Sequence, residues 1–124
     1  MITNQPEKKA SYLVICRSNY FNDVRPSDKV SQKTTGYAEA VALAKTYFES
    51  GNAAEFGIFL KEGKYLADLW AAHLILEWGQ PHPSLVNECL DVIERYAASP
   101  FDAALAKQEQ RWLNAYFKTK QSAG

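Results

Sequence analysis

The longest apolar stretch of the chain runs from Tyr65 to Gly79, and it is hydrophobic on almost every side of a helical projection. A helix that is apolar all round is either buried in a protein core or spans a membrane. This run is shorter than the roughly 20 apolar residues that a membrane span requires. We therefore expect residues 65–79 to form a central buried helix, over which the rest of the chain folds.

Amphipathic helices are predicted on both sides of this central stretch. Apolar residues recur at helical spacing over 37–50 and again over 84–97. A further helix is predicted from Ser99, where Ser, Pro and Asp form a typical helix start, to about Lys118. Gly and Pro residues separate these segments, so the connections are short and neighbouring helices are expected to pack antiparallel. The pattern predicts a mostly α protein built of stacked helical hairpins.

Two short segments fit either a strand or a helix. Residues 11–17 form a continuous apolar run with β-branched members, which favours a strand, but the longer segment 11–21 also has a helical face. Residues 54–60 fit a short helix, which we favour, or a strand before the turn at Gly63. An α+β fold is therefore the alternative to the mostly α fold.

The stretch 22–36 is polar and is the longest part of the chain without a periodic signal. A loop of this length inside a small domain is typically functional, or it is partly ordered. The terminal segments 1–10 and 118–124 are polar, and we expect them to fray. The length of 124 residues predicts a single domain over 1–124.

Composition and charge favour a partner that is another protein. The 14 basic and 14 acidic residues are spread evenly along the chain, which argues against a nucleic-acid binder held by phosphate contacts. The zero net charge gives little repulsion between copies and is compatible with a homodimer. Because the N-terminus lacks a signal organisation and no run is long enough for a membrane span, we expect a soluble, cytoplasmic protein that binds no membrane.

The central stretch also carries a family resemblance. The segment from Asp68 to Glu77, D-L-W-A-A-H-L-I-L-E, is followed after a Gly-Pro break by a helix rich in Leu, Val and Ile. This arrangement resembles HEAT-like helical repeats over about residues 52–117, especially those of small bacterial single-domain proteins of unknown function. The adjacent Ala71 and Ala72 would let a neighbouring helix approach closely, whereas Asp68 stands where such repeats often carry Arg.

The resemblance implies a fold that binds other proteins, although a fold alone does not determine a function. Proteins of this size and type include immunity proteins, which neutralise toxins of neighbouring bacteria. We therefore expect a non-enzymatic interaction domain that acts as an immunity or inhibitor protein. The alternative from a different class is a small α+β module that binds a ligand or has a regulatory role.

One strip of the central helix combines aromatic and polar side chains. At about 100° per residue, this strip contains Leu66, Trp70, His73 and Glu77. A Trp beside charged groups is typical of an interface anchor, so we predict that these residues form a partner-binding edge. A core Trp with a polar rim is the alternative interpretation. Asp68 lies on the opposite side, where it is either a first-turn carboxylate that favours the helix dipole, the interpretation that we favour, or a buried, hydrogen-bonded carboxylate.

Candidate chemistry is sparse in this sequence. His73 and Glu77 are four residues apart, a spacing at which a carboxylate could orient a general base in a small hydrolase. The other histidine is His82, and neither histidine has the spacing of a metal site with Cys16 or Cys89. The sequence contains no nucleotide-binding glycine motif and no nucleophile motif. We therefore predict no catalytic residue, metal or cofactor, and we expect both cysteines to be buried free thiols.

Overall fold

The computed structural model describes the backbone of residues 5–123 and the side chains of residues 11–120. Within this range the chain forms α-helices and 3-10 helices, and it contains no β-strand. The α-helices are α1 (Gln5–Phe21), α2 (Thr35–Glu49), α3 (Ala53–Phe56), α4 (Ala67–Trp78), α5 (Pro83–Ala97) and α6 (Ala103–Ala123). The 3-10 helices are η1 (Ser31–Lys33), η2 (Gly57–Lys61) and η3 (Lys64–Leu66). The mostly α prediction is confirmed, and the α+β alternative is wrong because 11–17 and 54–60 are both helical.

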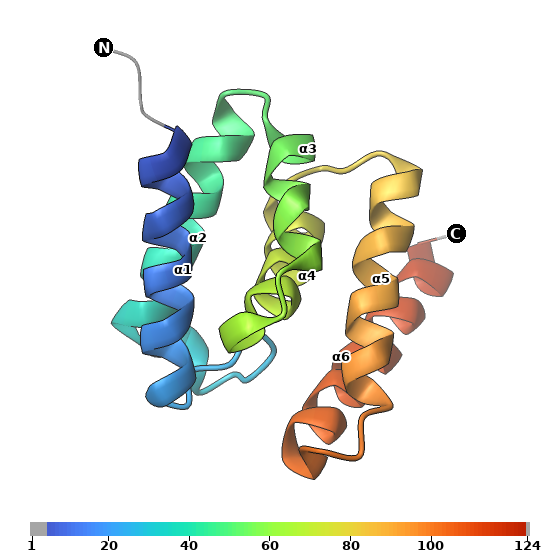
Figure 1. Ribbon diagram of the computed structural model, residues 1–124. Helices are drawn as coiled ribbons and strands as arrows, with labels where there is room; N and C mark the ends of the chain where they lie inside the picture. Colours follow the sequence, from blue (N-terminus) through green and yellow to red (C-terminus); the bar gives the residue numbers. More distant parts are fainter. Residues whose placement is uncertain (1–4, 124) are drawn as a thin grey trace.

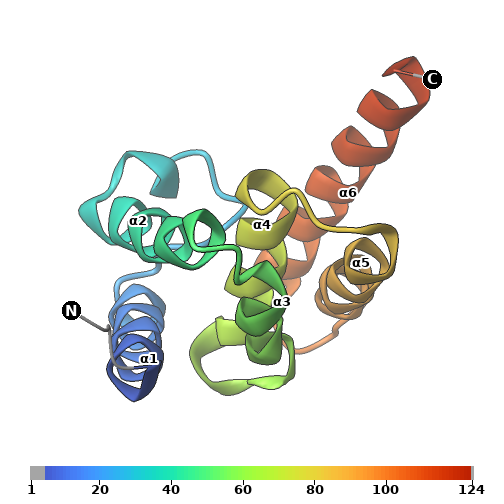
Figure 2. The ribbon, with the colours of Figure 1, turned by 90° about the horizontal axis from the view of Figure 1, so that it is seen from above.

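The helices form three antiparallel pairs that lie side by side (Figure 1). α1 pairs with α2, the α3–η2 segment pairs with α4, and α5 pairs with α6. Short connections make each helix return along the preceding one. Figure 2 shows that α6 extends away from the other helices toward its C-terminal end. The arrangement is consistent with a helical-repeat fold.

α4 lies at the centre of the molecule, in contact with α1, α2, α3, η2 and α5. All residues of α4 from 67 to 75 are buried, and Ala71 and Ala72 have no exposed surface. The prediction of a central buried helix is confirmed. The helix begins at Ala67 because Tyr65 and Leu66 adopt a left-handed backbone conformation, with φ angles of 55° and 59°.

Local side-chain bonds determine where several helices begin. The Asp102 carboxylate accepts a hydrogen bond from the Leu105 N–H at 3.0 Å, so α6 begins after Asp102 and not at the predicted Ser99. The Nδ1 of His82 accepts from the Leu85 N–H at 3.3 Å and caps α5. Such caps satisfy backbone donors that have no partner within the helix. His82 therefore has a structural role at a helix end.

The connection between α1 and α2, residues 22–34, is ordered by its own side chains. Asp28 accepts hydrogen bonds from the Ser31 hydroxyl at 2.9 Å and from the Val30 N–H at 3.3 Å. The Ser31 hydroxyl oxygen in turn accepts from the Arg25 N–H at 2.8 Å. The predicted loop is therefore partly ordered and contains η1. The expected fraying of 1–10 and 118–124 falls partly outside the described residues. Within them, α1 begins at Gln5 and α6 ends at Ala123.

α1 and α2 approach each other closely at Gly36. Asn19 is buried on α1, and its Nδ2 donates a hydrogen bond to the Gly36 carbonyl oxygen at 3.2 Å. A Cβ atom at position 36 would lie 2.0 Å from the Asn19 Oδ1. The absence of a side chain at Gly36 therefore allows the first helical pair to close.

Candidate functional site

Three of the four residues predicted to form a partner-binding edge are buried. Trp70 has no exposed surface, and His73 and Leu66 are 4% and 9% exposed. Only Glu77 of the four is exposed. The expectation that this strip reaches solvent is wrong for the three buried residues, because neighbouring helices cover that side of α4. The alternative interpretation, a core Trp, describes Trp70.

Aromatic residues of α2 and α6 provide this cover. The Tyr37 ring on α2 lies 5.6 Å from the Trp70 ring, measured between centroids. On the α6 side, the Trp112 ring packs perpendicular to His73 with the centroids 4.5 Å apart. Trp70 and His73 of this strip are therefore part of the core, and only Glu77 lies at the surface.

A buried chain of polar side chains connects α4, α6 and the 22–34 loop. The His73 Nε2 lies 2.6 Å from the Glu109 Oε1, and Glu109 has no exposed surface. The hydroxyl of Ser27 in the loop donates a hydrogen bond to Oε2, the other oxygen of the same carboxylate. Glu109, and not the predicted Glu77, is therefore the carboxylate that pairs with His73. One signal could have identified Glu109, because this carboxylate shares the apolar face of its helix with Leu105 and Leu113.

The order of these three groups is typical of a structural network. In an activated nucleophile, the hydroxyl donates to a histidine that a carboxylate orients. Here the carboxylate of Glu109 stands between the hydroxyl and the imidazole, so Ser27 has no hydrogen bond to a histidine that could act as its general base. The imidazole of His73 is also almost fully buried, which leaves little surface for a substrate. The cluster is thus suited to joining three segments of the fold.

Asp68 lies in the first turn of α4, as the favoured interpretation requires, and it is also the buried, hydrogen-bonded carboxylate of the alternative. Its Oδ1 accepts a hydrogen bond from the Tyr96 hydroxyl at 2.7 Å and one from the Leu69 N–H at 2.8 Å. Burial raises the pKa of the Asp68 carboxyl above its ordinary value of 3.8, although both hydrogen bonds act in the opposite direction. Asp68 is buried because Tyr96 of α5 reaches this side of α4, which the helical projection alone does not show.

Both cysteines are buried free thiols, as predicted. Burial raises the pKa of the Cys16 thiol to about 12 and that of the Cys89 thiol to about 12. Both groups therefore stay protonated at neutral pH, unlike a reactive cysteine with a lowered pKa. Among the residues that the structure describes, no group of His, Cys, Asp and Glu side chains could hold a metal ion.

The end of α1, η3 and the α5–α6 turn lie at the lower end of Figure 1, and each of them carries an exposed or half-buried aromatic residue. We name this surface the aromatic end, and it consists of Tyr20, Phe21, Tyr65 and Phe101. Phe101 is 96% exposed and Phe21 is 66% exposed. The Tyr65 ring centroid lies 5.8 Å from that of Tyr20 and 6.0 Å from that of Phe21. Tyr20, Phe101 and Asp102 contribute to the lining of one pocket of about 340 Å³.

A strained backbone presents Tyr65 at this surface. Tyr65 and Leu66 are consecutive left-handed residues, a conformation that costs roughly 1–2 kcal/mol for each side chain other than Gly. The next residue is tied to α1, because the Tyr12 hydroxyl donates to the Ala67 carbonyl oxygen at 2.6 Å. Strain of this kind persists where the surroundings enforce it, and it concentrates at binding sites. The position of Tyr65 is therefore determined by the fold around it.

Basic side chains surround the aromatic end. The guanidinium of Arg17 lies 6.0 Å from the Phe21 ring centroid, and that of Arg25 lies 5.5 Å from the Tyr20 ring centroid. Lys64 lines a neighbouring pocket beside Tyr20. Arg25 is paired with Asp23 at 3.3 Å, whereas Arg17 and Lys64 have no ion pair with any described residue. Arg17 and Lys64 are therefore two cations at the aromatic end without an ion pair to a described residue, and Asp102, which lines the pocket beside Tyr20 and Phe101, is an acidic group at the same surface.

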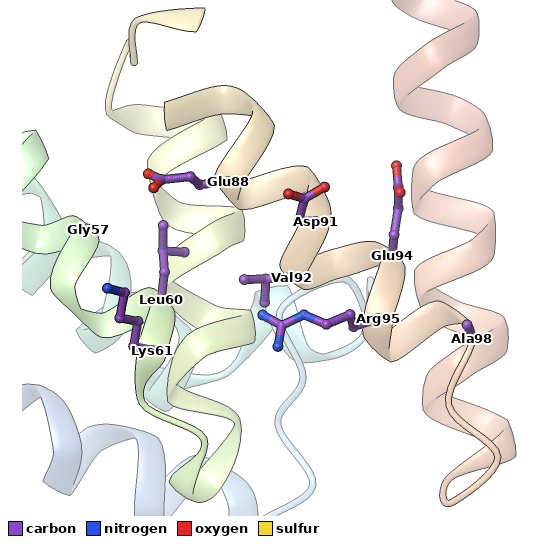
Figure 3. Close-up of a pocket in the computed structure, with 9 residues that line it drawn as sticks. All are labelled: Gly57, Leu60, Lys61, Glu88, Asp91, Val92, Glu94, Arg95 and Ala98. Atoms are coloured by element: carbon purple, nitrogen blue, oxygen red, sulfur yellow. The ribbon is translucent and has the colours of Figure 1, made fainter. Parts of the chain in front are cut away.

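A larger groove of about 750 Å³ lies between η2 and α5 (Figure 3). Leu60 and Val92 contribute apolar surface to it. The charged side chains around it are Lys61, Glu88, Asp91, Glu94 and Arg95. In Figure 3 the Arg95 side chain reaches across the groove, whereas Glu94 points away from η2. The lack of an aromatic side chain distinguishes this groove from the aromatic end.

No family model, curated protein or solved structure matches the chain. In the part of the chain that the structure describes, every helix is too short or too polar to cross a membrane. The candidate sites therefore rest on the geometry of the chain itself.

Proposed function

We propose that this chain is a non-enzymatic protein–protein interaction domain of the HEAT-like type, and that it binds its partner through the aromatic end. The observation that carries the proposal is the cluster of exposed Tyr20, Phe21 and Phe101 around the half-buried ring of Tyr65. Aromatic and Arg side chains are enriched among the residues that dominate binding energy at protein interfaces. Covering such rings with a partner removes apolar surface from water, which favours association.

The chemistry of the rim indicates the kind of partner. Arg17 and Lys64 are cationic and form no ion pair with another described residue. Tyr20 lines two pockets, and their volumes are about 450 and 340 Å³. A fitting partner presents an apolar side chain surrounded by carboxylates. Opposite charges at a rim mainly accelerate association and select the partner, while the buried aromatic centre supplies the affinity.

The finer assignment is an immunity or inhibitor protein of a bacterium that acts in the cytoplasm. Three antiparallel helical pairs and the closely packed Ala71 and Ala72 of α4 support a HEAT-like scaffold for this role. In that case the partner is a toxin, and a gene beside that of this chain is the first candidate. Co-expression of the neighbouring gene product with this chain tests the finer assignment directly.

The test of the binding surface compares three serine variants of exposed phenylalanines. Phe21→Ser and Phe101→Ser alter the aromatic end, whereas Phe117→Ser alters an exposed ring on α6 that lies outside it. A partner captured from the producing cells is purified, and its affinity for each variant is measured by calorimetry. We expect each change at the aromatic end to weaken binding about 30-fold, equivalent to about 2 kcal/mol.

Phe117→Ser should bind as the unaltered chain does. Equal binding by all three variants would place the interface elsewhere and contradict the proposed surface. If light scattering instead shows a homodimer that Phe101→Ser dissociates, the aromatic end binds a second copy of the chain and not a different protein.

A further inference from the structure

A pocket of about 520 Å³ lies between the 22–34 loop and α6. It shares no lining residue with the aromatic end or with the η2–α5 groove. Its volume is within the range of about 300–1,000 Å³ that is typical of small-molecule sites. The residues that shape its chemistry are Ser27, Asp28 and Lys29 from the loop and Arg111 and Trp112 from α6.

The wall of this pocket is built on the buried polar cluster. Ser27 is held by its hydrogen bond to Glu109, whose other carboxylate oxygen is bound to His73. Trp112 packs against His73 and stacks on Tyr116, with ring centroids 5.0 Å apart and an interplanar angle of 16°. A wall held in place before binding lowers the conformational entropy that a ligand must overcome.

The charge around the pocket is positive. Lys29 and Arg111 enter from two different elements, and neither forms an ion pair with another described residue. The carboxylate of Asp28 already accepts hydrogen bonds from the Ser31 hydroxyl and from a backbone N–H within the loop. The carboxylate of Glu109 is likewise hydrogen-bonded, to Ser27 and to His73. The two cations are therefore the groups that remain available to a ligand.

We propose that this pocket binds a small organic anion, in which a carboxylate or phosphate group is attached to a planar apolar body. Lys29 and Arg111 bind the anionic group, and Arg111 offers the forked donors that suit both carboxylate and phosphate oxygens. Trp112 supplies an aromatic wall for the planar body. The site also accounts for the long 22–34 connection, because loops of this length within compact domains are commonly functional.

The first test is a titration of ¹⁵N-labelled protein with three probes, followed by NMR. Indole-3-acetate and phenyl phosphate are anionic, and indole-3-acetamide is the neutral counterpart of the first. We expect both anions to shift the Trp112 indole N–H signal and the amide signals of 27–32 and 108–115. The neutral amide should bind about tenfold more weakly, because it lacks the charge-assisted hydrogen bonds. The anion that binds more tightly shows whether the pocket prefers a carboxylate or a phosphate group.

The second test uses charge-neutralising variants at exposed positions, where folding is little affected. Arg111→Gln and Lys29→Gln should each weaken binding of the preferred anion about tenfold. Lys107→Gln is the matched control, because Lys107 is exposed on α6 but does not line the pocket. The proposal is overturned if neither anion binds at millimolar concentration, if the neutral probe binds equally well, or if Arg111→Gln binds as the unaltered protein does.

Discussion

His73 and Glu109 are 36 positions apart in the chain, yet their side chains meet at 2.6 Å in the core. Both side chains are almost fully shielded from water. Ser27 adds a third segment to this contact by donating to the same carboxylate. Because water cannot replace a lost partner at this depth, each group depends on the others for its hydrogen bonds.

Replacing Glu109 with Leu leaves the imidazole of His73 and the hydroxyl of Ser27 without a partner. We expect the free energy of unfolding to fall by about 3–5 kcal/mol, as found when one member of a buried pair is removed. Urea denaturation at neutral pH measures this change. Glu77→Leu on the exposed end of α4 is the control and should change stability by less than about 0.5 kcal/mol.

The double variant His73→Leu/Glu109→Leu should recover part of this loss, since replacing a whole buried pair with apolar side chains is often near neutral. A loss below about 1 kcal/mol for Glu109→Leu alone would show that the buried pair contributes little to the fold.

The ionisation of Asp68 should make stability depend on pH. Burial raises the pKa of this carboxyl in the folded state above 3.8, so the folded protein binds the proton at a higher pH than the unfolded chain does. The resulting stability is fully present below 3.8 and is lost as the pH rises through the folded-state pKa. Asp68→Asn removes this ionisation but keeps an oxygen that can accept from Tyr96.

We therefore expect the stability of Asp68→Asn relative to the unaltered protein to be greatest near neutral pH and to shrink as the pH falls toward 3.8. Urea denaturation of both proteins at a series of pH values measures the difference. A difference that stays constant across the series would mean that Asp68 has the same pKa in the folded and unfolded states.

The two thiols should resist modification in the native protein. Burial holds the pKa of Cys16 and that of Cys89 each at about 12, so thiolate is scarce at neutral pH, and the sulfur atoms are also covered. We expect very slow reaction with a disulfide reagent such as DTNB in buffer, and release of two equivalents of product in denaturant. Rapid reaction of either thiol in buffer would indicate local opening of its helix.

Gly36→Ala should weaken the contact between α1 and α2. The added Cβ would lie 2.0 Å from the buried Oδ1 of Asn19, whose amide donates to the residue-36 carbonyl oxygen. We expect a loss of about 1–3 kcal/mol in unfolding free energy, typical of overpacking. Gly63→Ala is the matched control, because no heavy atom lies within 4 Å of its added Cβ.

At position 63 the φ angle of −81° suits an alanine, so this control should be neutral or stabilising by up to about 1 kcal/mol. Thermal or urea unfolding of both variants provides the comparison. Equal stability of the two variants would show that Asn19 moves aside without loss.

Local patterns predicted the helices because helix formation depends mainly on neighbours within one or two turns. The clearest example is α5, whose apolar positions recur at helical spacing after two prolines. For the segment 11–21 the sequence did not decide between a strand and a helix, because its apolar run fits the period of either structure. In the structure this segment is a helix. Its spacings of four and three residues place Tyr12, Cys16 and Asn19 on the side that faces the core.

The candidate site depended on contacts that the local pattern does not contain. The helical projection placed Trp70, His73 and Glu77 on one strip of α4, but it carried no information on which side of that helix the other helices cover. Tyr37 and Trp112 cover it from distant parts of the chain. The aromatic end was missed for the same reason, since its residues lie on three elements that only the fold brings together.

By itself, the sequence determined that the chain is mostly helical and that the Tyr65–Gly79 stretch lies at its centre. This was possible because periodicity, capping residues and Gly or Pro breaks act over short distances. Only the tertiary structure decided that His73 is paired with Glu109, that Asp68 is buried against Tyr96, and which aromatic residues stay exposed. Those outcomes depend on which helix faces pack together, and packing joins residues that are far apart in the chain.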